Sequence, residues 1–149
     1  MMDFRTFLPL ADTLANGATE AEWRSAASRA YYAAFHVARL LLASLGFRVP
    51  RADRAHPYLW LRLSNAGDAA VMQAGRRLGD LRSDRNLADY DAHLTLPQVT
   101  ALNDVALAEQ VIKALDAAAI EPVRSQITTA MRDYERDVLK DVTWQPPPP

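Results

Sequence analysis

An arginine within an apolar helix face is the first residue of this sequence that could do chemistry. Between Leu78 and His93, apolar residues recur at helical spacing at Leu81 and Ala88, and Arg85 stands where that pattern calls for an apolar side chain. Burying an unpaired guanidinium is costly, so Arg85 must meet a carboxylate, a hydroxyl, water or a bound anion. Because a guanidinium can hold a phosphate through paired hydrogen bonds, phosphate binding is one chemistry open to Arg85.

The sequence leaves open which side chain pairs with Arg85, and which one pairs with Arg29 on another predicted helix. Three polar residues spaced i, i+4 and i+7 share the helix face beside Arg85, and these are Arg82, Asn86 and Asp89. In a purely structural interpretation, Arg85 pairs with Asp89 one turn later on the same helix. Alternatively, Arg29 pairs with Asp89 or Asp91 from another helix.

A second line of polar residues runs along a long and otherwise apolar segment between residues 19 and 45. At the helical spacing i, i+4, i+7, i+11 and i+14, it consists of Ser25, Arg29, Tyr32, His36 and Arg39. Two polar lines on two apolar helices predict that these helices face each other and share a polar cleft.

The three histidines do not have the spacing of a metal site, and the chain has no cysteine. We therefore expect no metal and no cofactor. His36 is either a general base on the second polar line or a core histidine paired with a carboxylate. His93 is either a base just beyond the end of its helix or an exposed loop residue. His56 precedes Pro57 and is expected to cap a short helix.

Helix start and stop signals define the elements that must position these residues. A capping box at Thr19–Glu22 predicts a long helix that ends before Gly46, and Asp68 is the predicted N-cap of the helix that carries Arg85. A second capping box is expected at Thr95–Gln98. The predicted helices cover residues 3–15, 19–45, 56–63, 68–90, 95–119 and 121–138.

These elements predict an all-α protein, specifically an antiparallel up-and-down helical bundle of four main helices with extra short and C-terminal helices. No strand-like alternation appears. Residues 1–143 are expected to form one domain, and residues 144–149, which end in four prolines, an extended tail.

Composition limits the classes of partner. The chain has 149 residues, with 17 basic and 18 acidic side chains and a net charge of −1, so any nucleic-acid binding must come from a local patch. The one local basic cluster contains Arg48, Arg51 and Arg54. Without a signal-peptide pattern or a long apolar span, we expect a cytoplasmic protein that has no membrane partner.

Two motifs together resemble the HEPN superfamily, most closely its small stand-alone bacterial and archaeal members. The first is Ser28–His36, followed by a leucine-rich run, and the second is Leu81–Asp91; the resemblance covers roughly residues 19–118. It implies an antiparallel helical bundle, commonly a homodimer whose motif helices meet. Many HEPN proteins are metal-independent endoribonucleases that act as toxins or in phage defence, and they are frequently paired with a small nucleotidyltransferase.

The HEPN signature is an arginine, usually followed by Asn, Asp or His, and then a histidine after four to six intervening residues. Arg85 and Asn86 match its beginning, but Tyr90 stands at a histidine position and His93 lies beyond seven intervening residues. Because tyrosine has a pKa of about 10 against about 6.5 for histidine, Tyr90 is a poor general base at neutral pH.

The first hypothesis is therefore a HEPN-type RNA- or nucleotide-binding protein, with metal-independent RNA cleavage as a toxin or defence factor if the altered motif is active. In that role Arg85 stabilises the transition state and Asn86 and Asp89 orient the Arg85 guanidinium. Tyr90 or His93 contacts the ribose. The expected RNA- or nucleotide-binding residues are Arg29, Tyr32, His36 and Arg82. The alternative is a non-catalytic interaction module that partners a nucleotidyltransferase, with Tyr90 as an acceptor of nucleotide transfer.

Overall fold

The computed structural model describes residues 1–149, and all of its regular secondary structure is helical, which confirms the predicted all-α bundle. The α-helices are α1 (Phe7–Ala15), α2 (Glu20–Leu45), α3 (Ala55–Leu63), α4 (Ala69–Tyr90), α5 (Gln98–Ala118) and α6 (Val123–Tyr134). Short 3-10 helices at Phe4–Thr6 and Ala52–Arg54 precede α1 and α3, and a π-helical turn at Glu135–Leu139 follows α6.

The contacts within the chain divide it into two compact units. The first unit comprises Met1–Val37 and Arg77–Ile112, and the second comprises Ala38–Arg76 and Lys113–Pro149. The division falls inside α2, α4 and α5, so each of these helices contributes to both units. The single domain expected for residues 1–143 stays a prediction.

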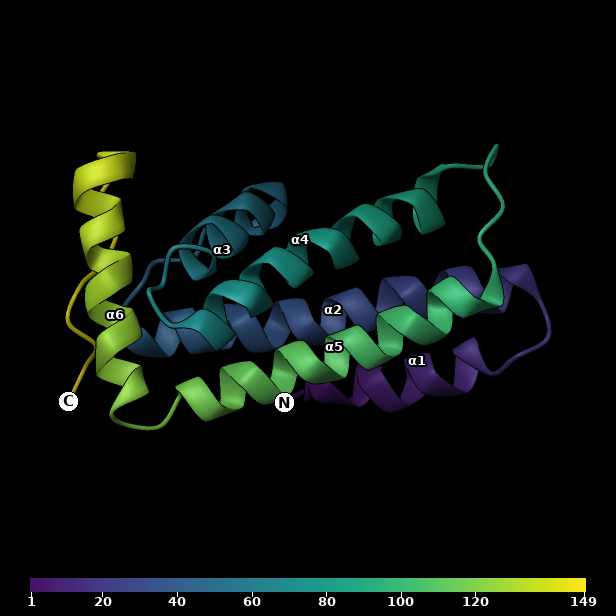
Figure 1. The fold of residues 1–149 in the computed structure, drawn as a ribbon, viewed down its shortest axis with the longest axis horizontal. Coiled ribbons are helices and arrows are strands. Elements are labelled where there is room, and N and C mark those ends of the chain that lie inside the picture. Colours follow the sequence, from purple (N-terminus) through teal and green to yellow (C-terminus); the bar gives the residue numbers. More distant parts are fainter. The chain divides into compact units, whose positions relative to one another are not determined.

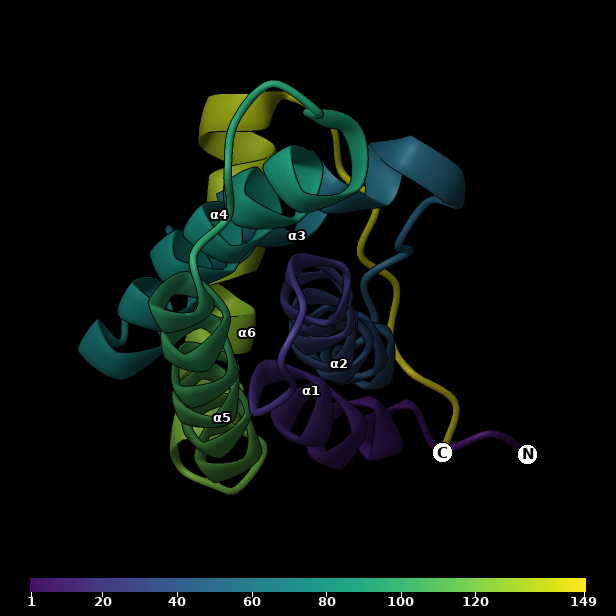
Figure 2. The ribbon, with the colours of Figure 1, turned by 90° about the vertical axis from the view of Figure 1, so that its right-hand side faces the viewer.

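The first unit is an antiparallel arrangement of four helical segments, from α1, α2, α4 and α5 (Figures 1 and 2). Contacts between neighbouring helices show that their directions alternate. Ser28 of α2 bonds to Asp89 near the end of α4, and Arg77 near the middle of α4 bonds to Gln110 of α5. Many of the buried residues on α2 are alanines, which let the helices approach closely.

Two of the four predicted helix N-terminal signals form as expected. The Thr19 hydroxyl accepts a hydrogen bond from the Glu22 backbone N–H at 3.2 Å, and the Glu22 carboxylate accepts one from the Thr19 N–H. Asp68 accepts a hydrogen bond from the Val71 N–H at 3.1 Å and so caps α4.

The capping box predicted at Thr95–Gln98 was wrong. The Gln98 amide instead donates to the Ala15 carbonyl at 3.0 Å and so satisfies an oxygen at the end of α1. The sequence pattern contains the right residues, but a carbonyl brought close by the fold competes for the glutamine. The proposal that His56 caps α3 was also wrong, because His56 lies buried inside the first turn of that helix.

The second unit contains the end of α2, all of α3 and α6, the start of α4 and the end of α5. α2 ends at Gly46, whose φ of 106° is favourable only for glycine, and the Phe47 N–H bonds back to the Leu42 carbonyl at 3.0 Å. Residues 140–149 form no regular secondary structure, and the extended tail expected at residues 144–149 stays a prediction. Part of that tail is fixed, since the Gln145 N–H donates to the Gly46 carbonyl at 2.9 Å and the Trp144 indole N–H to the Leu45 carbonyl at 2.8 Å.

No helix combines the length and the apolar character that a membrane crossing requires. No three His, Cys, Asp or Glu side chains gather closely enough to hold a metal ion.

Candidate arginine–tyrosine site

Arg85 lies on α4 in contact with its own helix neighbours. Its Nε atom is 2.9 Å from Asp89 Oδ2, so the ion pair considered from the sequence is formed. The Nε–H does not point at that oxygen, which makes the contact an electrostatic one rather than a well-directed hydrogen bond. Nη1 donates to Asn86 Oδ1 at 3.0 Å, and Nη2 lies 3.5 Å from the Tyr90 hydroxyl.

Two tyrosines flank the Arg85 guanidinium. Its Cζ atom is 5.1 Å from the ring centre of Tyr32 on α2 and 5.3 Å from that of Tyr90 on α4. Arg29 lies 5.3 Å from the Tyr32 ring and 4.9 Å from the Phe7 ring. These cation–π contacts join the two predicted motifs, so the expectation that α2 and α4 face each other here is confirmed.

Asp89 is held from both helices, but its partner on α2 differs from the one considered. The Ser28 hydroxyl lies 3.1 Å from Asp89 Oδ2, whereas Arg29 contacts Ser28 and aromatic rings. Ser28 is 3% exposed and was not predicted as a site residue. The signal that could have found it is the i, i+4, i+8 spacing of Arg24, Ser28 and Tyr32, which is the line of α2 that meets α4.

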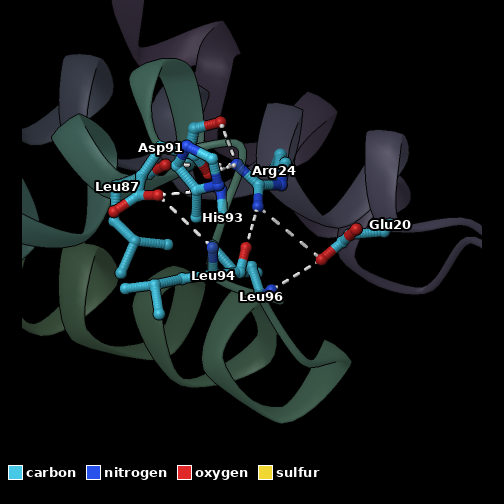
Figure 3. A network of polar contacts seen from close by, with 8 residues as sticks. Glu20, Arg24, Leu87, Asp91, His93, Leu94 and Leu96 are labelled. Atoms are coloured by element: carbon cyan, nitrogen blue, oxygen red, sulfur yellow. Dashed lines mark hydrogen bonds and ion pairs between the residues drawn. The ribbon is translucent and has the colours of Figure 1, made fainter.

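Arg24 is a second residue that the sequence interpretation missed. Its Nη1 donates to the carbonyls of Leu87, Ala88 and Asp91 at 3.2, 3.1 and 2.7 Å, and Nη2 donates to the Leu94 carbonyl (Figure 3). A cation from α2 therefore satisfies the last carbonyls of α4, where the helix dipole favours positive charge.

Glu20 extends this network to the connection before α5. Its Oε1 lies 3.7 Å from Arg24 Nη2 and accepts a hydrogen bond from the Leu96 N–H at 2.6 Å (Figure 3). Asp91 Oδ1 accepts the His93 N–H at 2.9 Å. The backbone that follows Tyr90 is thus fixed at several points.

The two candidate histidines do not contact the arginine. His93 is exposed, its hydrogen bond comes from its backbone N–H, and no contact joins its ring to Arg85. His36 is half-buried and stacks on Phe4, with ring centres 3.7 Å apart and planes 13° apart. Its ring centre is 6.3 Å from that of Tyr32, so His36 belongs to an aromatic stack beside the site.

Arg82 lies on α4 one helical turn before Asn86, and its buried Nε has no hydrogen-bond partner. Burial raises the pKa of the neighbouring Tyr31 far above its usual value, although the positive charges of Arg82 and Arg85 oppose this shift. Burial therefore favours the neutral form of Tyr31.

A carboxyl pair also lies in the first unit, between α4 and α5. Burial, followed by the nearby carboxyl of Asp84, raises the pKa of Asp104 to about 9. Asp104 is 4% exposed, and its buried Oδ2 has no hydrogen-bond partner, which favours the neutral form of this carboxyl. The sequence signal that could have identified Asp104 is its i, i+3, i+7 spacing with Ala101 and Ala108, which are both buried.

The structure thus brings together Arg85, Asn86, Asp89 and Tyr90 with Arg29 and Tyr32, and it leaves His93 outside this contact cluster. Chemically, the cluster offers a guanidinium that could bind a phosphate and an exposed phenol ring that could stack on a nucleobase. No imidazole contacts the Arg85 guanidinium or the Tyr90 ring. No family model, curated protein or solved structure matches this chain.

Proposed function

We propose that this chain is a HEPN-type RNA- or nucleotide-binding protein that holds a phosphate at Arg85. The observation that carries the proposal is the position of the Arg85 guanidinium between Tyr32 and Tyr90, which come from the two motifs that resemble the HEPN superfamily. A cation next to an exposed aromatic ring is the combination that single-stranded nucleic acids need, since it serves both phosphate and base.

In the proposed complex, the Nη atoms of Arg85 exchange their weak contacts with neighbouring side chains for phosphate oxygens. Asn86 and Asp89 orient the guanidinium, while Arg29 and Arg82 add positive charge. Tyr90 is 75% exposed, so its ring is accessible for stacking on a base. The proposed site predicts weaker binding at high salt, because phosphate contacts release counterions.

Metal-independent cleavage by a cytoplasmic toxin or defence factor is the catalytic form of the same proposal. Arg85 is suited to stabilise the negative charge of a pentacoordinate phosphorane. Activation of the ribose 2′-hydroxyl needs a base, and a cleaving form requires the His93 ring to turn toward the substrate. Binding therefore has more support from the geometry than cleavage.

The test is cleavage and binding of a pool of structured RNAs in excess chelator, with wild type, Arg85→Ala, Tyr90→Phe and His93→Ala compared. Arg76→Ala is the matched control, because Arg76 is an exposed arginine of the same helix outside the cluster. Chelator-resistant cutting that is lost in Arg85→Ala, but not in the control, supports the nuclease. Full RNA binding by Arg85→Ala contradicts the whole proposal.

The second candidate is a non-catalytic interaction module that partners a nucleotidyltransferase. It is favoured by the neighbours that Arg85 already has, since Asp89 and Asn86 together occupy its Nε and Nη1 sides. In this proposal the helical bundle forms a homodimer and also binds the nucleotidyltransferase. The exposed Tyr90 is the acceptor of nucleotide transfer. Sedimentation of the purified chain tests the dimer, and mass spectrometry after incubation with such a partner and ATP tests the transfer.

A further inference from the structure

A pocket of about 400 Å³ lies in the second unit, and no residue of the proposed RNA site lines it. It is formed by the segment that follows α2, by α3 and by the chain after the π-helical turn. Its apolar walls come from Pro50, Pro57, Leu61 and Leu139. A volume of this size lies within the range of sites that hold small organic molecules, roughly 300–1,000 Å³.

Two exposed arginines line the same pocket. Arg48 Nη2 donates to the Gln145 side-chain oxygen, a neutral acceptor that leaves the charge of Arg48 uncompensated. Arg54 makes no ion pair and no hydrogen bond through its side chain. The one carboxylate among the lining residues is Asp141. Since the whole chain carries a net charge of −1, this positive charge is a local feature of the pocket.

A buried polar network fixes one wall of the pocket. Arg62 and Glu135 are 3% and 0% exposed, and the Arg62 Nε–H donates to Glu135 Oε2 at 2.8 Å. Glu135 also accepts the Thr143 hydroxyl at 2.6 Å, and the same hydroxyl bonds to Tyr58. Arg62 is therefore neutralised by Glu135, which leaves Arg48 and Arg54 as the cations that a ligand can use.

We propose that this pocket binds a small organic anion with an apolar body. The carboxylate or phosphate head pairs with Arg48 and Arg54, because guanidinium groups bind both kinds of anion through paired hydrogen bonds. The body lies against Pro57 and Leu61. The pocket offers no other free charged donor, so a neutral ligand of the same shape loses the head-group contacts. This inference is independent of the proposed RNA function.

The experiment is an NMR titration of the 149-residue chain in the Arg85→Ala background, so that the RNA site does not compete for anions. The probes are 4-phenylbutyrate for a carboxylate and phenyl phosphate for a phosphate ester. The controls are 4-phenylbutanamide, which lacks the charge, and inorganic phosphate, which lacks the apolar group. We expect amide shifts centred on residues 48–62 and 139–143, with a dissociation constant on the order of a millimolar for at least one organic anion. The preferred probe identifies the head group.

Two variants and one control locate the site. Arg54→Gln should weaken binding about fivefold to tenfold, as expected for the loss of one charge-assisted contact, and Leu61→Trp should block the pocket. Arg51→Gln is the matched control, because Arg51 is an exposed arginine of the same segment that does not line the pocket. Equal binding of the amide, equal effects of Arg54→Gln and Arg51→Gln, or shifts confined to other residues would overturn the proposal.

Discussion

Arg62 Nη2 lies 2.8 Å from Glu135 Oε2, and both side chains are almost completely buried. Burial acts to raise the pKa of Glu135, but bonds from Thr143 and Arg62 outweigh it and hold the pKa below its usual value. The pair links α3 to the π-helical turn, and Glu135 also binds the N–H groups of Thr143 and Trp144. The Glu135 carboxylate therefore holds both α3 and the backbone at residues 143–144 in the second unit.

Removing one partner of this pair should cost far more than removing both. Glu135→Leu leaves a buried guanidinium without its counter-charge, and we expect a loss of about 3–5 kcal/mol in the free energy of unfolding. The double variant Arg62→Met, Glu135→Leu should recover a large part of that loss. Urea denaturation of both variants measures the difference. A double variant as unstable as the single one would show that the tail contacts of Glu135, rather than the charge pair, dominate.

Arg24 should stabilise the end of α4. Arg24→Met removes the donor to the Leu87, Ala88, Asp91 and Leu94 carbonyls, and we expect a loss of about 1–2 kcal/mol. Amide hydrogen exchange should speed up most at residues 88–96. Arg76→Met, at an exposed position of the same helix, is the control and should change neither quantity. Uniform acceleration of exchange along the whole chain would contradict a local role.

Asp104 should make stability fall as pH rises. The pKa of Asp104 is about 9 in the folded chain, whereas the ordinary pKa of an aspartate is 3.8, so between these values the folded state holds a proton that the unfolded state has released. The stabilisation from that proton is complete below the unfolded pKa and is lost as pH rises toward the folded pKa, with a slope of at most about 1.4 kcal/mol per pH unit.

The measurement is urea denaturation of wild type and Asp104→Asn at pH 5, 7 and 8.5. Asparagine stays neutral, so the variant should gain stability relative to wild type as pH rises. Asp80→Asn, at an exposed position, should keep the wild-type slope. Parallel pH profiles for wild type and Asp104→Asn would refute the raised pKa of Asp104.

Two glycine-to-alanine substitutions should act in opposite directions. A Cβ at Gly46 would collide with the Gln145 carbonyl and the Trp144 ring, and the φ of 106° adds strain, so Gly46→Ala should lose about 1–3 kcal/mol. At Gly79, inside α4, nothing lies within 4 Å of an added Cβ. Gly79→Ala should therefore gain about 0.5–1 kcal/mol from helix propensity. Thermal unfolding of the two variants checks both signs.

Interactions between residues close in sequence are the part of this protein that the sequence alone determined. The Thr19–Glu22 capping box, the Asp68 cap and the Gly46 stop involve residues at most a few positions apart, so their patterns predict the helix ends directly. The ion pair of Arg85 with Asp89 is of the same kind, because helical geometry brings i and i+4 together. The RNA role of that cluster stays a prediction.

Only the tertiary structure decided which distant groups meet. Gln98 binds Ala15 instead of its own helix start, and Arg24 reaches the end of α4, because packing places those carbonyls within reach. The buried pair of Arg62 and Glu135 joins residues that no local pattern connects. Each of these contacts satisfies a polar group that burial would otherwise leave unpaired, and burial is a property of the folded chain rather than of any short segment.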